Sequence, residues 1–278
     1  MLKKIALTLL LILAAGCDAL DPFDDVIIGS TDSFPLYSQS VHDTYEIFVY
    51  LPPGYFRDGA PLPLLVGLDG DLSFWDQAAI LSTEIKESSV RPCIFASIGY
   101  GSEDECDRKR NRDLTPTRTE GIEDYKTGEA DAFYEFIRTE LVPEIENRYN
   151  IIPGNTKALY GHSYGGLFAY YALFQDRHTN VFDKFIAAGT SFWYDEGVIL
   201  EYEEAFSTQN SDLPVTVYTA MGSLEGVAMC AYFKVMNRRI KQRNYPHIVY
   251  KDKLLKGFGH DRSDYETFRR GIRFVLPK

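Results

Sequence analysis

Residues 157–174 read KALYGHSYGGLFAYYALF, and this stretch decides the fold. Its first four residues predict a short strand. The part from Tyr164 to about Phe174 is apolar nearly all round, which is typical of a buried helix. Between them stands the turn Gly161-His162-Ser163-Tyr164-Gly165. At a sharp strand-to-helix corner of this kind the central residue is strained and bulky neighbours would collide. We therefore expect Ser163 to project above a sheet at the N-terminus of a helix.

The rest of the chain alternates strand-like apolar runs with helical patterns. The continuous apolar run 62–68 predicts a strand buried on both faces. The apolar spacing over 129–149 predicts a helix that is interrupted at Pro143. The expected strands are 45–51, 62–68, 93–98, 157–160, 185–188, 215–220 and 248–255. The expected helices are 73–86, 129–149, 164–174, 227–243 and 264–274. Ser73 is the expected cap of the first helix, and a long loop is expected over 100–127. This alternation predicts an α/β fold with a mostly parallel sheet and helices on both faces.

Length and composition narrow the class of protein. The 278 residues fit one large domain, and a hydrophobic content of 45% supports a packed core. The formal charge is −11, and it becomes −13 beyond residue 16 because the two lysines before that point are removed. No stretch combines clustered Lys and Arg with aromatic residues, which disfavours nucleic-acid binding. The basic run at 107–112 is flanked by acids and is expected to form a solvated loop. No paired His or Cys spacing suggests zinc, so neither a metal nor a cofactor is expected.

The N-terminus predicts export and a lipid anchor. A short basic segment precedes an unbroken apolar run from Ile5 to Ala15, which is too short for a comfortable membrane span. Leu13-Ala14-Ala15-Gly16-Cys17 resembles a bacterial lipobox, in which the cysteine is lipidated and becomes the first mature residue. We therefore expect a signal peptide over 1–16, a tether over 17–25 and one domain over 26–278. A plain cleaved signal with an accidental cysteine is the alternative.

The expected product is an exported bacterial lipoprotein that is held at the membrane through Cys17 and faces the periplasm. The sequence leaves open whether the inner or the outer membrane holds it. In that oxidising compartment Cys93, Cys106 and Cys230 allow one disulfide and one free thiol. Cys93 and Cys106 lie a strand length apart, roughly 20 Å. The sequence therefore favours a bridge between Cys106 and Cys230, which both follow expected strands.

Ser163 needs a base before its hydroxyl can act as a nucleophile. His260 follows the last expected strand in Gly257-Phe258-Gly259-His260, where the glycines allow a loop to bring its ring to the sheet edge. A carboxylate between Ser163 and His260 in the chain would hold the imidazole tautomer. Glu225 is favoured over Asp195 for this role, and a dyad without an acid is also possible. His162 is expected to point away from the nucleophile and to pack beneath the turn.

An anionic intermediate at Ser163 would need backbone N–H donors. One is expected from Tyr164, because it begins the helix that follows the nucleophile. The other is expected from Gly70 or Asp71, in the turn after the early buried strand.

The sequence resembles the putative-esterase family of α/β hydrolases, which includes siderophore esterases, feruloyl esterases and esterase D-type enzymes. The resemblance covers nearly all of residues 40–275. It rests on Leu68-Asp69-Gly70-Asp71, Ile98-Gly99-Tyr100-Gly101, Arg112-Asp113-Leu114-Thr115-Pro116, the 131–149 helix, Gly161-His162-Ser163-Tyr164-Gly165-Gly166-Leu167-Phe168, Phe192-Trp193 and Gly259-His260. The branch it resembles most is that of the trilactone-siderophore esterases.

That resemblance implies substrate-binding roles. Arg112 would contact an anionic or catecholate group, and Phe74, Trp75 and Trp193 would line an aromatic pocket. The structural alternative for Arg112 is an ion pair with Asp113 that pins the loop.

The expected function is a serine carboxylic-ester hydrolase that acts on a small-molecule ester through a Ser163 acyl-enzyme, and that is similar to siderophore esterases. Two alternatives stay open. One is an acyltransferase of the same fold, and the other is a non-catalytic ligand-binding lipoprotein.

Overall fold

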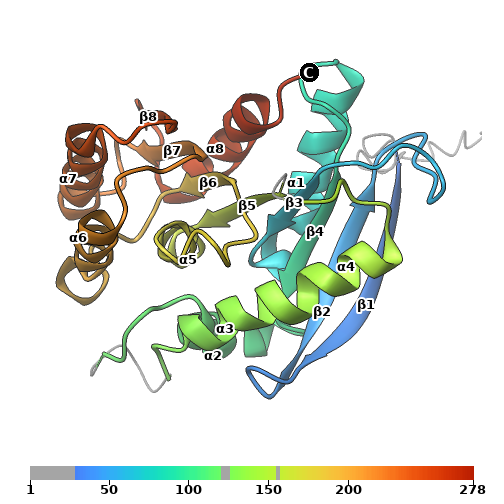
Figure 1. Cartoon of the computed structure of the whole chain (residues 1–278), viewed down its shortest axis with the longest axis horizontal. Helices are drawn as coiled ribbons and strands as arrows, with labels where there is room; N and C mark the ends of the chain where they lie inside the picture. Colours follow the sequence, from blue (N-terminus) through green and yellow to red (C-terminus); the bar gives the residue numbers. More distant parts are fainter. Residues whose placement is uncertain (1–28, 120–125, 155–156) are drawn as a thin grey trace, which may run out of the picture.

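The computed structural model describes residues 29–119, 126–154 and 157–278. These residues form an eight-stranded sheet in the order β1-β2-β4-β3-β5-β6-β7-β8 (Figure 1). The strands are β1 (Ser30–Ser38), β2 (Asp43–Leu51), β3 (Leu64–Gly67), β4 (Ile94–Gly99), β5 (Lys157–His162), β6 (Lys184–Ala188), β7 (Thr216–Gly222) and β8 (Val249–Leu255). β2 runs antiparallel to both β1 and β4, and every other pair is parallel. The predicted mostly parallel sheet is confirmed.

Helices cover both faces of the sheet (Figure 1). On one face α1 (Gly70–Lys86) and α8 (His260–Val275) pack on a cluster that includes Phe95, Tyr160 and Ile186. The opposite face carries α2 (Glu103–Asp113), α3 (Ala130–Phe136), α4 (Val142–Arg148), α5 (Tyr164–Leu173), α6 (Ile199–Gln209) and α7 (Val227–Arg243). None of the helices in the described ranges is long and apolar enough to cross a bilayer.

Helix α2 corrects the expectation of a long loop over 100–127. It begins after Ser102, whose hydroxyl accepts a hydrogen bond from the Glu105 N–H in the first turn. The run at 107–112 belongs to α2 and is not a solvated loop, since Lys109 and Arg112 are buried among ion pairs. The spacing of apolar residues could not predict this helix, because its buried face carries charged side chains instead of the usual apolar stripe.

Two more elements were not predicted from the sequence. Strand β1 is largely exposed, and it tolerates Pro35 because an edge strand leaves some N–H groups unpaired. Helix α6 lies between β6 and β7 and was missed as well.

The predicted interruption at Pro143 is confirmed. A π-helical turn at Ile137–Leu141 separates α3 from α4, and Pro143 stands in the first turn of α4. A proline has no N–H to donate to the preceding turn, so the helix changes its hydrogen-bond pattern just before it.

The expected Cys106–Cys230 disulfide is wrong, because Cys93, Cys106 and Cys230 are all free thiols. Cys106 lies on α2 after β4, and Cys230 lies on α7 after β7. Three strands separate β4 from β7, so the preceding strands stand about 19 Å apart at about 4.8 Å per spacing. A disulfide needs Cα atoms within about 7 Å.

Strands β3, β5, β6, β7 and β8 are parallel, so their carboxyl ends meet at one edge of the sheet. Ligand and active sites of open α/β sheets form in the crevice outside this edge. Asp69, Ser163, Gly189, Glu225 and His260 each lie in or just after the turn that follows one of these strands. The fold therefore gathers at one edge residues that are up to about 190 positions apart in the chain.

Candidate active site

Ser163 stands at the corner between β5 and α5 with φ 58° and ψ −114°. This backbone conformation is strained for a residue with a side chain, and such strain gathers at functional sites. A Cβ added at Gly161 would lie 2.1 Å from the Gly165 carbonyl oxygen, so only glycine fits there. A Cβ added at Gly166 would lie 2.6 Å from Thr190 Oγ1, which shows how closely α5 approaches the sheet. The Ser163 Oγ lies 3.2 Å from the Ser191 Oγ.

His260 begins α8 and is bonded to Glu225, which lies in the turn after β7. The distance from His260 Nδ1 to Glu225 Oε2 is 2.7 Å. The Glu225 side chain is fully buried, whereas the His260 side chain is 34% exposed. The pair therefore consists of a buried carboxylate and a solvent-accessible imidazole.

Glu225 is held in the ionised form. Its Oε1 accepts hydrogen bonds from the Ser263 hydroxyl at 2.6 Å and from the Gly222 N–H. Burial alone would raise the pKa of this carboxyl, but the hydrogen bonds from His260, Ser263 and Gly222 outweigh it and lower the pKa. An ionised carboxylate at Nδ1 fixes the tautomer whose Nε2 is a free acceptor.

Asp195, the rival acid, forms neither a hydrogen bond nor an ion pair with His260. It lies at Tyr194–Gly197 with φ 46°, and its Oδ2 accepts a hydrogen bond from the Thr117 hydroxyl at 2.5 Å. The structure thus brings Glu225, and not Asp195, to the imidazole.

His162 was expected to point away from the nucleophile and to pack beneath the turn, but its ring lies beside that of His260. Its ring centroid is 4.3 Å from that of His260. Burial, and after it the neighbouring His260, lowers the pKa of His162 to about 4. The buried ring is therefore neutral near pH 7 and adds no positive charge beside His260.

Gly189 is a part of the site that the sequence did not reveal. It follows β6 with φ 49°, and an added Cβ would lie 2.9 Å from Glu225 Oε2 and 3.0 Å from His260 Nδ1. Only a glycine lets the backbone approach the acid–imidazole bond so closely.

The turn after β3 lies close to the turn that carries Ser163. Asp69 precedes α1 with a left-handed backbone, φ 57°, and its Oδ2 lies 3.5 Å from a Cβ built on Gly165. The N–H groups of Gly70 and Asp71 belong to the first turn of α1, where backbone donors have no partner within the helix. The cap of α1 is therefore Asp69 and not Ser73, which lies inside the helix with its hydroxyl on the Asp69 carbonyl.

Arg110 holds this turn in place, a role that was not predicted from the sequence. Its guanidinium donates to both oxygens of Asp69 at 3.0 Å and lies 5.6 Å from the centroid of the Tyr164 ring. Arg110 lies on α2, whereas Asp69 precedes α1 and Tyr164 begins α5. The role of Arg110 depends on contacts between these three segments, which are distant in the chain, so the sequence alone does not indicate it.

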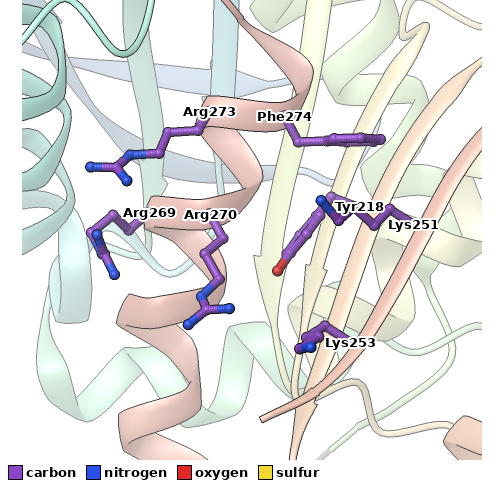
Figure 2. A pocket seen from close by; sticks show the side chains of 7 residues that line it. All are labelled: Tyr218, Lys251, Lys253, Arg269, Arg270, Arg273 and Phe274. Atoms are coloured by element: carbon purple, nitrogen blue, oxygen red, sulfur yellow. The ribbon is translucent and has the colours of Figure 1, made fainter.

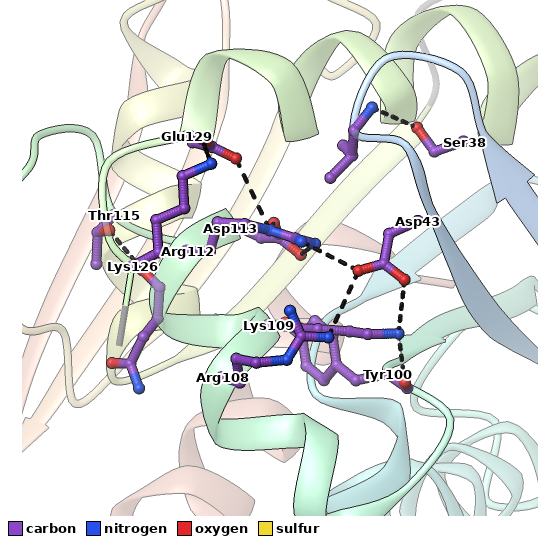
Figure 3. A network of polar contacts seen from close by, with 12 residues as sticks. Ser38, Asp43, Tyr100, Arg108, Lys109, Arg112, Asp113, Thr115, Lys126 and Glu129 are labelled. Carbon is purple, nitrogen blue, oxygen red and sulfur yellow. Dashed lines mark hydrogen bonds and ion pairs between the residues drawn. The ribbon is translucent and has the colours of Figure 1, made fainter. Parts of the chain in front are cut away.

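Arg112 belongs to a buried polar cluster (Figure 3). Its Nε lies 2.6 Å from Asp113 Oδ1, its Nη1 lies 3.0 Å from Asp43, and its Nη2 lies 3.2 Å from the Tyr45 hydroxyl. Every nitrogen of the guanidinium is thus engaged within the protein. The geometry favours the structural alternative, in which Arg112 pins α2 to the start of β2.

The three aromatic residues predicted to share a pocket are not brought together. Phe74 is 1% exposed and stacks on Phe48 and Phe95 in the core. Phe74 and Trp75 line a hollow of about 330 Å³ beside β1. Trp193 instead packs against Tyr164, next to the nucleophile, at a ring distance of 6.2 Å. Of the three, Trp193 alone contacts a neighbour of Ser163 among the described residues.

Within the described ranges, no group of three His, Cys, Asp or Glu residues could hold a metal ion. The chemistry that the site offers is nucleophilic. It comprises a strained serine, an accessible imidazole backed by a carboxylate, and backbone donors at two helix N-termini.

A mostly parallel sheet with a strained serine between a strand and a buried helix defines the chain as an α/β hydrolase. Residues 38–269 match the model of the family described as "Putative esterase". The match covers most of the chain, so the protein belongs to this family and is an esterase.

Known relatives fit this assignment. The chain is 28% identical over 211 residues to the ferri-bacillibactin esterase BesA of Bacillus subtilis (strain 168), covering 71% of this chain and 72% of BesA. It is 34% identical over 154 residues to the siderophore triacetylfusarinine C esterase of Aspergillus fumigatus, covering 52% of this chain and 50% of that protein. The crystal structure of the BES protein from Bacillus cereus superimposes with a TM-score of 0.79 at 25% identity, over 91% of this chain and 98% of the other.

Proposed function

We propose that the protein is a serine carboxylic-ester hydrolase that works through an acyl-enzyme on Ser163. The observation that carries this proposal is the 2.7 Å bond between Glu225 and His260, at the same sheet edge as the strained Ser163. A serine, an imidazole and an ionised carboxylate are the three groups that nucleophilic ester cleavage needs.

In the proposed reaction, His260 Nε2 takes the proton of Ser163 as Oγ attacks the ester carbonyl carbon. The carbonyl oxygen gains the electron pair, and the Tyr164 N–H together with that of Gly70 or Asp71 stabilises it. When the intermediate collapses, the C–O bond to the alcohol breaks and the imidazolium returns the proton to the leaving oxygen. Water then repeats these steps on the acyl-enzyme, releasing the acid and restoring Ser163.

We propose that the substrate is a siderophore ester. The support is that the two curated relatives described above are named as siderophore esterases. The Tyr164–Trp193 pair beside the nucleophile offers an aromatic surface of the kind that an aromatic acyl group stacks on. Arg112 is not part of this proposal, because its nitrogens are engaged in the buried cluster.

Hydrolysis of p-nitrophenyl acetate and butyrate tests the reaction, and a panel of trilactone siderophores, feruloyl esters and short-chain esters tests the substrate. The wild-type protein should hydrolyse these esters and be labelled by a fluorophosphonate probe, and Ser163→Ala should lose both the hydrolysis and the labelling. No turnover and no labelling of wild type would show a binding protein instead. Adding an alcohol acceptor and identifying the products separates hydrolysis from acyl transfer.

We also propose that the protein is a lipoprotein anchored through Cys17 and facing the periplasm. The segments concerned, 1–16 and 17–25, lie outside the described residues, so the support is the sequence pattern alone. Cys17→Ser should move the protein from the membrane to the soluble fraction. Unchanged fractionation would contradict the anchor.

A further inference from the structure

A basic pocket lies far from the catalytic edge of the sheet, between β8 and α8. It has a volume of about 470 Å³, and its lining residues are Tyr218, Lys251, Lys253, Arg269, Arg270, Arg273 and Phe274 (Figure 2). Arg270 stands ten residues after His260 on the same helix, which is about 15 Å at 1.5 Å per residue. The pocket is therefore separate from the proposed active site.

Five of the seven lining residues are cationic and none is acidic, although the whole chain carries a charge of −11. The acids near the pocket do not line it, and they form ion pairs with its arginines. Glu266 contacts Arg269 and Arg270, and Glu84 contacts Arg273. In Figure 2, Arg269 and Arg273 point away from β8, whereas Arg270 extends toward Tyr218.

Lys251 and Lys253 are left without a carboxylate. They are two positions apart on a strand, so they share the face that looks toward α8. Among the described residues neither forms an ion pair, and Lys251 Nζ lies 5.3 Å from the centroid of the Phe274 ring. Asp252, between them, points to the other face and pairs with Lys241 on α7.

Protection of an edge strand accounts for part of this pattern. β8 is the last strand of the sheet, and lysines on an edge discourage pairing with another chain. Such protection requires neither a hollow nor a guanidinium facing the two lysines. Lys251 and Lys253 face the hollow without an ion-pair partner among the described residues, and like charges in that position repel each other. Arg270, although it pairs with Glu266, adds a third donor to the same hollow, so the three side chains together favour a bound anion.

We propose that this pocket binds a phosphate-bearing anion through Lys251, Lys253 and Arg270. A phosphate offers more charge and more acceptor oxygens than a carboxylate, which suits three converging donors. Tyr218 and Phe274, whose rings are 5.8 Å apart, form the wall against which the group carrying the phosphate packs. A soluble phosphate ester and a phospholipid headgroup share this chemistry.

Titration calorimetry of the full chain with inorganic phosphate and with glycerol 3-phosphate tests the soluble source. Co-sedimentation with phosphatidylcholine vesicles, with and without phosphatidylglycerol, tests the headgroup. The test variant is Lys251→Ala/Lys253→Ala. The matched control is Lys234→Ala/Arg238→Ala, which removes two exposed charges from α7 near the other face of β8.

The test variant should bind at least one probe about tenfold more weakly, while the control should bind like wild type. Binding of the free phosphates identifies the soluble source, and binding only to phosphatidylglycerol vesicles identifies the headgroup. Equal p-nitrophenyl butyrate turnover in both variants would show that each is folded and that the pocket is distinct from the active site. No binding of any probe by wild type, or the same loss in both variants, would overturn the proposal.

Discussion

Two of the acids near the carboxyl edge of the sheet can be compared, Glu225 in its pair with His260 and Asp113 in its pair with Arg112. In each the acid is fully buried, and the shortest contact is 2.7 Å in the first pair and 2.6 Å in the second. The two pairs differ in whether the basic partner keeps a nitrogen atom that is not already bonded within the protein. The His260 ring is one-third exposed, and its Nε2 has no hydrogen-bond partner in the described part of the chain, whereas every nitrogen of Arg112 is engaged.

The difference distinguishes a reactive pair from a structural one. A buried acid that orients a group with one unused atom prepares that atom for chemistry. A buried acid whose partner is fully engaged joins segments of the chain, here α2 to the start of β2 (Figure 3). Burial of the acid and the length of the contact do not distinguish the Glu225–His260 pair from the Arg112–Asp113 pair, but substitutions in each pair do.

The largest effect is expected from Glu225→Gln. An amide can donate to Nδ1 and so hold the wrong imidazole tautomer, and kcat/KM should fall by about 10³- to 10⁴-fold. Steady-state hydrolysis of p-nitrophenyl butyrate measures this. Asp195→Asn is the control, and it should keep nearly full activity because Asp195 contacts Thr117. Full activity in Glu225→Gln would indicate a dyad that needs no acid.

Arg112→Met should act on stability rather than catalysis. It leaves the fully buried Asp113 without its cation, whereas Asp43 keeps Lys109, and this costs about 3–5 kcal/mol of unfolding free energy. Urea denaturation measures the loss. The control Arg108→Met breaks an exposed pair with Glu105 and should cost less than about 1 kcal/mol. A higher KM for anionic esters with unchanged stability would restore the substrate-binding role.

Asp264 extends the comparison to a buried acid that has no basic partner among the residues that the structure describes. Burial, and after it the charges of Asp69 and Asp76, raises the pKa of Asp264 to about 7. Because the folded pKa lies above the unfolded value, near 3.9, its contribution to stability is present at low pH and is lost as pH rises from about 4 to about 7. Asp264→Asn should remove this loss and raise the unfolding free energy at pH 8 by about 4 kcal/mol.

Urea denaturation of wild type and Asp264→Asn at pH 5 and pH 8 tests this. Asp261→Asn, which changes an exposed acid in the same helical turn, should leave the pH dependence unaltered. The same gain for Asp264→Asn at both pH values would mean that titration of Asp264 is not the cause.

The smallest effect is expected from Gly189→Ala. The added methyl group would press on both partners of the Glu225–His260 bond, so kcat/KM should fall about tenfold through misplacement of the ring. Gly257→Ala is the matched control, because it too has a positive φ but faces open space. Equal activity losses in the two variants would point to backbone strain and not to the collision.

Much of the fold could be predicted because local patterns carry it. The apolar runs of the buried strands and the glycine-rich turn at Ser163 are properties of short segments. Helix α2 and strand β1 could not be predicted in this way. The first is held by ion pairs to distant residues such as Asp43, and the second is an exposed edge strand that gains its place by pairing with β2.

The sequence by itself determined the glycine-rich turn at Ser163, the mostly parallel sheet and His260 as the candidate base, since each follows from residues adjacent in the chain. Only the tertiary structure placed Glu225 rather than Asp195 beside His260 and placed Arg112 in a buried polar cluster. It also revealed the positions of Gly189 and Arg110. It also separated Cys106 from Cys230. These outcomes depend on distances between segments that meet only when the sheet has formed, and chain order contains no direct record of such distances.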